Sequence, residues 1–149
     1  RVYSDRTEWF NSNKLAHRED GPAIEYFDGS RYWYQNGLQH RLDGPAKEYP
    51  CGATEWYRNG LAHREGGPAK ESANGQCKEW CRDGLHHRTD GPAIEVGNRK
   101  YWFIKGVPYT EEEFNKFLNQ SSVYDGKIIE IEGAKYKLVR AEKVPKDKI

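Results

Sequence analysis

The sequence predicts an all-β repeat protein: an antiparallel β-hairpin solenoid or meander of about five 23-residue units, with a C-terminal capping helix and hairpin. Three observations predict this class. Tryptophans recur at a fixed interval, two turn signals divide each interval, and the chain combines 13% aromatic residues with 15 glycines. The tryptophans that mark the units lie 22–24 residues apart, at Trp9, Trp33, Trp56, Trp80 and Trp102. We place the repeat array in residues 1–109 and the capping helix, hairpin and tail in residues 110–149.

Each sequence unit contains two glycine turns about half a period apart. One is an Asn-Gly or Asp-Gly dipeptide, which favours a type I′ hairpin turn. These dipeptides are Asn36-Gly37, Asn59-Gly60 and Asp83-Gly84. The other bend falls at Asp28-Gly29, Cys51-Gly52, Asn74-Gly75 and Gly97-Asn98. Aromatic-rich segments between turns are typical of strands, so we expect two strands per unit and nine or ten in all.

Stacking of the units should provide the core of the array. One hairpin unit cannot bury its own face, so neighbouring units must cover it. Because one tryptophan recurs in every unit, we expect Trp33, Trp56 and Trp80 to be buried and to stack on one another as a ladder.

The residues after the array predict a helical cap. Thr110 and Glu113 have the spacing of a capping box, and Tyr109 and Phe114 that of a hydrophobic staple. We expect a helix over about 111–119. Its apolar face, directed toward the last strands, is formed by Phe114, Phe117 and Leu118. A helix at this position would cover the open edge of the sheet.

The last part of the chain predicts a hairpin and a tail. Polar and apolar residues alternate over 128–139, around a turn at Glu132-Gly133. Residues 143–149 have the composition of a solvated tail.

The charge and cysteine content narrow the class of partner. The net charge is +1, which excludes the electrostatic footprint of a general nucleic-acid or acidic-membrane binder. We see no signal peptide and no run as long as a membrane span. Three cysteines form no regular disulfide framework, so we expect a cytoplasmic protein. Since the chain contains no Met, we expect residue 1 to be a trimmed or processed end.

The unit resembles a known repeat type. The pattern Trp-Tyr-x-Asn-Gly-x-x-His-Arg-x-Asp-Gly-Pro-Ala-x-Glu is similar to repeats in many tailed-phage and large-virus accessory proteins, which are distantly similar to variant MORN repeats. The array ending at 101–106 and the segment 110–114 also resemble that group, so the likeness covers roughly residues 1–120. It implies a non-enzymatic β-repeat scaffold of viral origin, acting in the host cytoplasm. It assigns no ligand and no catalytic residue.

A His-Arg-x-Asp motif is the first candidate site. It brings a histidine and a carboxylate together in sequence at His17/Asp20, His40/Asp43 and His87/Asp90. Such pairs can bind metal or act as a general acid and base. Catalysis needs one differentiated pocket, whereas this motif recurs almost unchanged. We therefore expect the aspartates to cap their Asp-Gly-Pro turns, the histidines to pack beside the tryptophans, and the protein not to be an enzyme.

An arginine column and a glutamate column share the same period. The columns are Arg18, Arg41, Arg64 and Arg88, and Glu25, Glu48, Glu71 and Glu95. Stacked like charges repel, so we expect the two columns to lie side by side as ion pairs. The alternative is an arginine row that faces an anionic partner.

Zinc-type donors occur in the fourth unit, at Cys77, Cys81, His86 and His87. Their spacing matches no standard zinc motif. Cys81 occupies the position that Tyr34 and Tyr57 fill in other units, which favours a small replacement for a ring. We expect no bound metal and no cofactor.

The leading hypothesis is a non-enzymatic scaffold that binds a macromolecular partner. The partner that we expect is a host protein, such as a defence factor, which the scaffold would occlude. The candidate binding residues vary between units or flank the turns: Arg58, Arg82, Gln35, Gln39, His86 and Lys70. One alternative is a carbohydrate- or choline-binding module that uses aromatic clefts. Another is a nucleotide- or nucleic-acid-binding protein that uses the arginine column.

Overall fold

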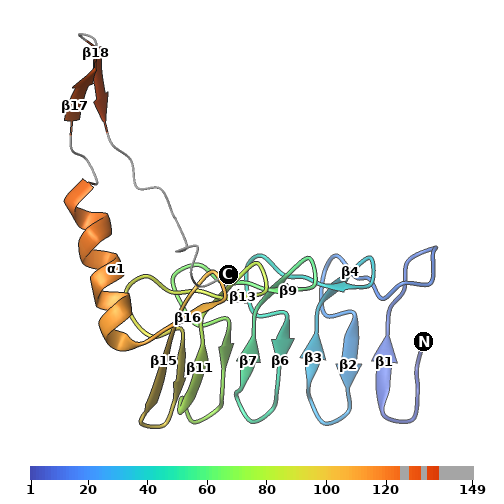
Figure 1. The fold of residues 1–149 in the computed structure, drawn as a ribbon. Helices are drawn as coiled ribbons and strands as arrows, with labels where there is room; N and C mark the ends of the chain where they lie inside the picture. Colours follow the sequence, from blue (N-terminus) through green and yellow to red (C-terminus); the bar gives the residue numbers. More distant parts are fainter. Residues whose placement is uncertain (125–127, 132–133, 138–149) are drawn as a thin grey trace.

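The computed structural model describes residues 1–124, 128–131 and 134–137. Its main feature is a ten-stranded antiparallel sheet, drawn as a row of short strands in Figure 1. In spatial order the strands are β1 (Arg6–Glu8), β2 (Ile24–Tyr26), β3 (Arg31–Tyr32), β6 (Lys47–Glu48), β7 (Thr54–Glu55), β10 (Lys70–Glu71), β11 (Cys77–Glu79), β14 (Ile94–Val96), β15 (Arg99–Ile104) and β16 (Val107–Tyr109). The predicted antiparallel β-structure is confirmed.

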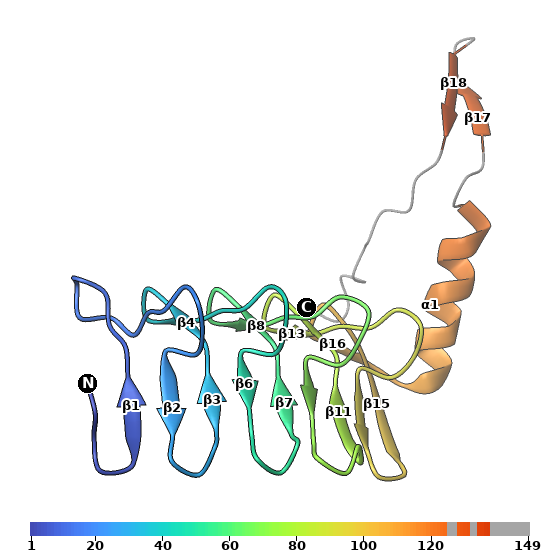
Figure 2. The same ribbon diagram turned by 180° about the vertical axis from the view of Figure 1, so that it is seen from behind.

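Three separate hairpins leave this sheet at one end of its strands. They are β4 (Tyr34–Gln35) with β5 (Leu38–Gln39), β8 (Tyr57–Arg58) with β9 (Leu61–Ala62), and β12 (Cys81–Arg82) with β13 (Leu85–His86). Figure 2 shows them along the upper side of the row, seen from behind. The expectation of two strands per unit and nine or ten in all therefore fits the ten-stranded sheet, but it does not include these hairpins. Trp33 marks the change from β3 to β4, because its N–H donates to Ala46 O (2.8 Å), next to β6, while its C=O accepts from His40 N–H (3.1 Å), next to β5.

The turns adopt the backbone conformation that the dipeptides predict. Asn36 and Gly37 have φ values of 51° and 81°, and Asn59, Gly60, Asp83 and Gly84 repeat them closely. Two consecutive positive φ values define a type I′ turn. The glycines of the other bends, including Gly29 and Gly52 (both 93°), are also left-handed.

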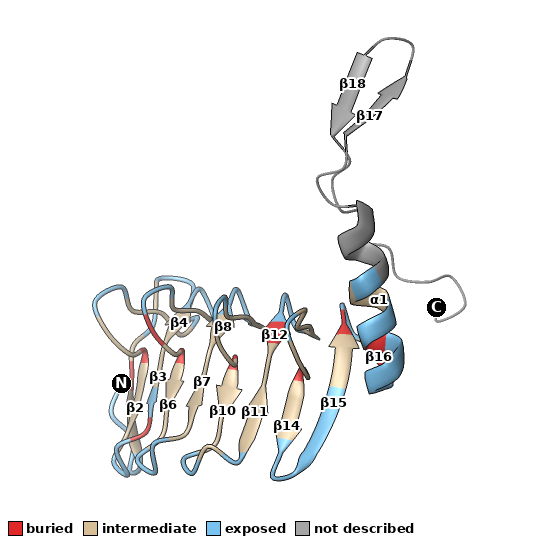
Figure 3. Cartoon of the chain, turned by 90° about the vertical axis from the view of Figure 1, so that its left-hand side faces the viewer, coloured by how far each residue is buried: buried red, intermediate tan, exposed pale blue. Residues whose placement is uncertain are grey.

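Alanine, and not tryptophan, fills the most buried column. The alanines of the Gly-Pro-Ala steps are fully buried, at Ala23, Ala46, Ala69 and Ala93. Figure 3 shows the buried residues as short red bands, mostly beside the ends of strands that are themselves of mostly intermediate burial. Trp33, Trp56 and Trp80 are only half-buried, so the prediction of buried tryptophans is wrong. A methyl side chain suits this column because it lets backbone segments approach closely around the Trp N–H to Ala C=O bonds.

The helix α1 (Glu111–Tyr124) packs against the last strands of the large sheet. Its capping box is formed, since Thr110 N–H donates to Glu113 Oε2 (2.8 Å) and Glu113 N–H donates to Thr110 Oγ1 (3.2 Å). A hydrophobic cluster joins helix and sheet through Ile104, Tyr109 and Phe114, with Phe117 and Leu118 packed against it. The helix continues beyond the predicted end at 119, because no Gly or Pro follows before Gly126.

A last hairpin follows the helix. β17 (Ile128–Ile131) pairs antiparallel with β18 (Ala134–Lys137), and Ile131 lies opposite Ala134. These strands confirm the hairpin predicted over 128–139. Its turn at Glu132-Gly133, residues 138–139 and the tail predicted at 143–149 lie outside the described residues.

Candidate functional site

Four arginines cover the ring faces of the first four tryptophans. Arg41 Cζ lies 4.0 Å from the centre of the Trp33 ring, and the equivalent distances are 3.9–4.1 Å. The remaining pairs are Arg18–Trp9, Arg64–Trp56 and Arg88–Trp80. A guanidinium group is attracted by the negative face of an indole ring, more strongly where water is partly excluded. An arginine, rather than a second tryptophan, therefore lies against each of these rings.

The glycine of each Gly-Pro-Ala step leaves room for the guanidinium group. A Cβ atom on Gly44 would lie 2.6 Å from Arg41 Cζ, which is a steric clash. The corresponding distances at Gly21, Gly67 and Gly91 are 3.0–3.1 Å. None of these glycines has a left-handed φ, so space and not backbone freedom explains them.

Replacing Gly44 with alanine should lower the free energy of unfolding by about 0.5–1 kcal/mol, because the new methyl group displaces the flexible end of Arg41 from Trp33. Urea denaturation measures the change. In an Arg41→Ala background, the same glycine substitution should cost much less. An equal cost in both backgrounds would contradict the steric explanation.

Carboxylates neutralise three of the four stacked arginines. Arg41 Nε lies 3.0 Å from Asp43 Oδ1, and its Nη1 lies 2.8 Å from Glu48 Oε1. The same two partners occur for Arg18, with Asp20 (3.0 Å) and Glu25 (3.5 Å), and for Arg88, with Asp90 (2.8 Å) and Glu95 (3.2 Å). Hydrogen bonds from Arg18 and Arg41 hold the pKa values of Asp20 and Asp43 below their usual range. The predicted pairing of the two columns is confirmed in these three units.

Arg64 is the exception. Gly66 stands where the other units have an aspartate, and Glu71 lies 3.3 Å from Lys78 Nζ. Among the described residues, Arg64 forms a bond to Pro68 O (3.1 Å) and stacks on Trp56 (4.1 Å), with no carboxylate partner. Arg64 is therefore a half-buried arginine whose guanidinium group no carboxylate in the described part of the chain neutralises at ion-pair distance.

Two shallow depressions adjoin Arg64. One, of about 280 Å³, is also lined by Trp56 and Arg58. The other, of about 440 Å³, is also lined by Trp80 and Arg82. Arg58 and Arg82 are exposed at equivalent positions of β8 and β12. We call Arg58, Arg64 and Arg82 the basic rim. Arg58 and Arg82 are two of the binding residues predicted from the sequence, and each lines one depression together with Arg64.

The other predicted binding residues differ in solvent exposure and in the contacts that their side chains already make. Gln35 is exposed and lines a third depression, beside Trp33. Gln39 is half-buried, and its Nε2 donates to Tyr34 Oη (3.1 Å). His86 and Lys70 are also half-buried, and both approach Glu79 Oε2, at 2.9 and 4.0 Å. Of these four residues, Gln35 is therefore the most accessible to a partner.

The histidines join consecutive units instead of pairing with the aspartates. His17 Nδ1 accepts a hydrogen bond from Asn36 N–H (3.1 Å), the first residue of the next type I′ turn. The same bond links His40 to Asn59, His63 to Asp83 and His87 to Lys105, at 3.1–3.2 Å. The aspartates of the motif bond to the arginines instead. This arrangement agrees with a structural role for the motif.

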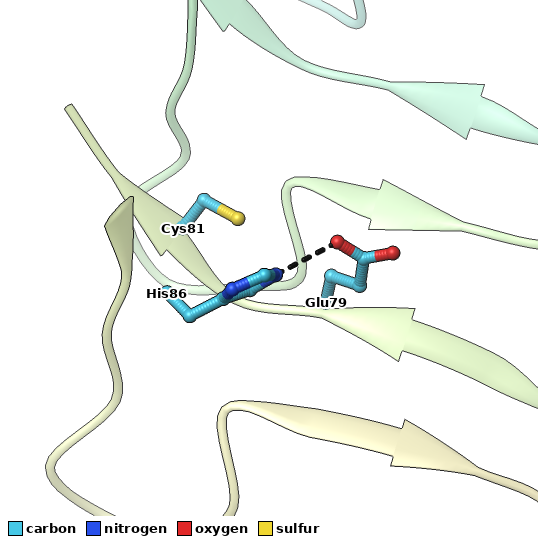
Figure 4. A group of neighbouring side chains, drawn as sticks. All are labelled: Glu79, Cys81 and His86. Carbon is cyan, nitrogen blue, oxygen red and sulfur yellow. Dashed lines mark hydrogen bonds and ion pairs between the residues drawn. The ribbon is translucent and has the colours of Figure 1, made fainter. Parts of the chain in front are cut away.

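The structure gathers a different set of donors in the fourth unit. One donor atom each of Glu79, Cys81 and His86 lies within 4.8 Å of the others, and Figure 4 shows the three side chains converging. Cys81 is buried, and burial, with a smaller effect of Glu79, raises the pKa of its thiol to about 11. Neither Cys77 nor His87, which the sequence pattern combined with Cys81, belongs to this group.

Sequence reasoning missed two of these features. Gly66 breaks the Arg-x-Asp pattern at a single unit, and that break was the available signal for Arg64. Glu79 carried no such signal, because Glu55 occupies the same position one unit earlier. Its proximity to Cys81 and His86 depends on strand register.

None of the helical residues that the structure describes forms a segment with the length and hydrophobicity of a membrane span. Comparisons with protein-family models, curated proteins and solved structures found no match to this chain.

Proposed function

We propose that this chain is a non-enzymatic repeat scaffold, a hairpin solenoid of about five 23-residue units, that binds a protein partner through the basic rim. The resemblance of its unit to phage and large-virus repeats points to a viral accessory protein. Its target would be a host defence protein in the cytoplasm, which the scaffold inhibits by occlusion. The observation that carries the proposal is the uncompensated charge of Arg64 between the exposed Arg58 and Arg82.

The charge distribution supports an acidic partner. The whole chain has a net charge of +1, whereas the depressions beside Arg64 hold a cluster of arginines that outnumbers their carboxylates, which are Glu65 in both and Asp90 in the second. Such a cluster accelerates encounter with a negatively charged surface and fixes its orientation. Arginine also forms bidentate bonds with carboxylates, which adds geometric specificity.

A nucleotide or nucleic acid is the second candidate partner. Arg58 and Arg64 line the same depression, and their guanidinium groups offer positive charge for a phosphate and a flat face for a base. Carbohydrate or choline binding has weaker support, because arginines already cover one face of each of the first four indole rings.

Replacing both Arg58 and Arg82 with alanine should weaken partner binding at least tenfold, about 1.4 kcal/mol, and shift Tm by no more than a degree or two. The partner is first identified by affinity capture from candidate host lysate, and its Kd is then measured by calorimetry. Arg31→Ala/Arg99→Ala is the matched control, because it removes two exposed arginines of the large sheet. If both double variants lost the same binding affinity, the loss would come from the change in net charge and not from the basic rim.

Introducing Asp at Gly66 tests the role of Arg64 separately. Gly66 has a φ of 76° and open space around its Cβ position, and Asp tolerates that region better than most residues. The new carboxylate should pair with Arg64 as Asp43 pairs with Arg41, and partner binding should weaken several-fold. Gly66→Asn, which lacks the charge, should bind normally. Intact-mass analysis of purified protein would reveal a co-purifying nucleotide, the outcome that favours the second candidate.

A further inference from the structure

The group of Glu79, Cys81 and His86 combines two departures from the sequence pattern. At the positions of Cys81 and His86, the preceding units have Tyr57 with Ala62 and Tyr34 with Gln39. Cys81 and His86 lie directly opposite each other in the β12–β13 pair. Both departures therefore occur at a single point of contact. Each introduces a side chain that zinc binds in proteins.

Glu79 supplies a third donor from the adjoining strand. It ends β11, two residues before Cys81, and its Oε2 lies 2.9 Å from His86 Nε2. Figure 4 shows this bond, with the sulfur atom of Cys81 directed toward the same region. Lys70 Nζ lies 4.0 Å from the same carboxylate oxygen.

We propose that Glu79, Cys81 and His86 bind a zinc ion, with the fourth coordination position open to water or to a donor atom from a partner. A thiolate and a carboxylate together balance the two positive charges of zinc, and the Lys70 ammonium group, 4.0 Å from the carboxylate, is the remaining charge beside the half-buried site. The thiol proton leaves to solvent when the Zn–S bond forms. The imidazole remains neutral and coordinates through a ring nitrogen.

The geometry is close to what such a site needs. Tetrahedral coordination with Zn–S near 2.3 Å and Zn–N or Zn–O near 2.1 Å separates donor atoms by about 3.4–3.6 Å. The donor atoms here lie within 4.8 Å of one another, so modest side-chain rotation brings them into range. Three protein ligands and one open position are the arrangement of exchangeable or catalytic zinc sites. The competing explanation is that the imidazole of His86 fills the volume that a tyrosine leaves when Cys81 replaces it.

Metal titration of the full chain tests the proposal. The purified protein, stripped with chelator and kept reduced, is titrated with Zn²⁺ alone by calorimetry and with Co²⁺ by absorption spectroscopy. We expect one Zn²⁺ per chain, a higher Tm with Zn²⁺, and an intense thiolate-to-cobalt band. Absence of both the calorimetric signal and the cobalt band would overturn the proposal and leave His86 as a packing residue.

Variants identify the ligands. Cys81→Ser and His86→Ala should each weaken Zn²⁺ binding at least tenfold, whereas Cys77→Ser and Cys51→Ser should bind it normally. Cys81→Tyr/His86→Ala recreates the Tyr57–Ala62 pair of the preceding unit, so it should fold with a Tm near that of the parent. This variant should show neither Zn²⁺ binding nor the cobalt band. Undiminished Zn²⁺ binding by the folded double variant would place the metal elsewhere and refute the assignment.

Discussion

Replacing Phe114 with alanine should lower the free energy of unfolding by about 3–5 kcal/mol. Phe114 is 2% exposed and lies at the centre of the cluster that joins α1 to β15 and β16, in contact with Ile104 and Tyr109. Removing its ring leaves a cavity that the rigid strand residues cannot fill. The effect is large because Phe114 and Ile104 are the most deeply buried large side chains among the described residues, each 2% exposed.

Urea denaturation followed by tryptophan fluorescence and by far-ultraviolet circular dichroism measures this effect. Phe27→Ala is the matched control, because Phe27 is 66% exposed and its loss should cost less than about 0.5 kcal/mol. Similar losses in the two variants would show that α1 does not stabilise the sheet. A selective loss of helical signal in Phe114→Ala would show that the cap unfolds separately from the strands.

Replacing Trp56 with alanine should lower the free energy of unfolding by about 2–4 kcal/mol. A fully buried tryptophan would cost about 3–5 kcal/mol, and Trp56 is only half-buried. The loss includes the stack with Arg64, whose Cζ lies 4.1 Å from the ring centre. Because Arg64 has no carboxylate partner among the described residues, the indole ring is its main side-chain contact.

A double-mutant cycle separates the ring from its stack. Trp56→Ala, Arg64→Ala and the double variant should give a coupling energy of about 1 kcal/mol. Trp56→Phe keeps an aromatic face and should recover part of the loss. Additive effects of the two alanine substitutions would mean that the Arg64 guanidinium gains nothing from the ring.

The chemistry of short segments could be predicted well. The turn dipeptides specify their own backbone geometry, as Asn36-Gly37 and Asn59-Gly60 show with φ values near 51° and 81°. The capping box between Thr110 and Glu113 could also be predicted from a short segment, since both partners lie within one helical turn. In each case the interacting atoms are separated by a few residues, and nothing distant is needed to bring them together.

The candidate site could be predicted only in part. The sequence analysis selected Arg58 and Arg82 as candidates, because their position varies within an otherwise regular frame. It did not relate them to Arg64, which lines depressions shared with both. The proximity of Glu79 to Cys81 and His86 likewise depends on where β11 ends and how β12 and β13 pair.

By itself the sequence determined the period, the positions of the turns and the existence of the cap. Only the tertiary structure decided that Ala69 and its equivalents are fully buried while Trp56 and its equivalents are half-buried under arginines. The physical reason is that both residue types recur with the same period, so periodicity cannot distinguish their environments. Burial depends on which neighbouring segment covers a side chain, and here close backbone packing selects the methyl group for the interior. The wider indole ring is left at the surface of the sheet, where a guanidinium group can cover it.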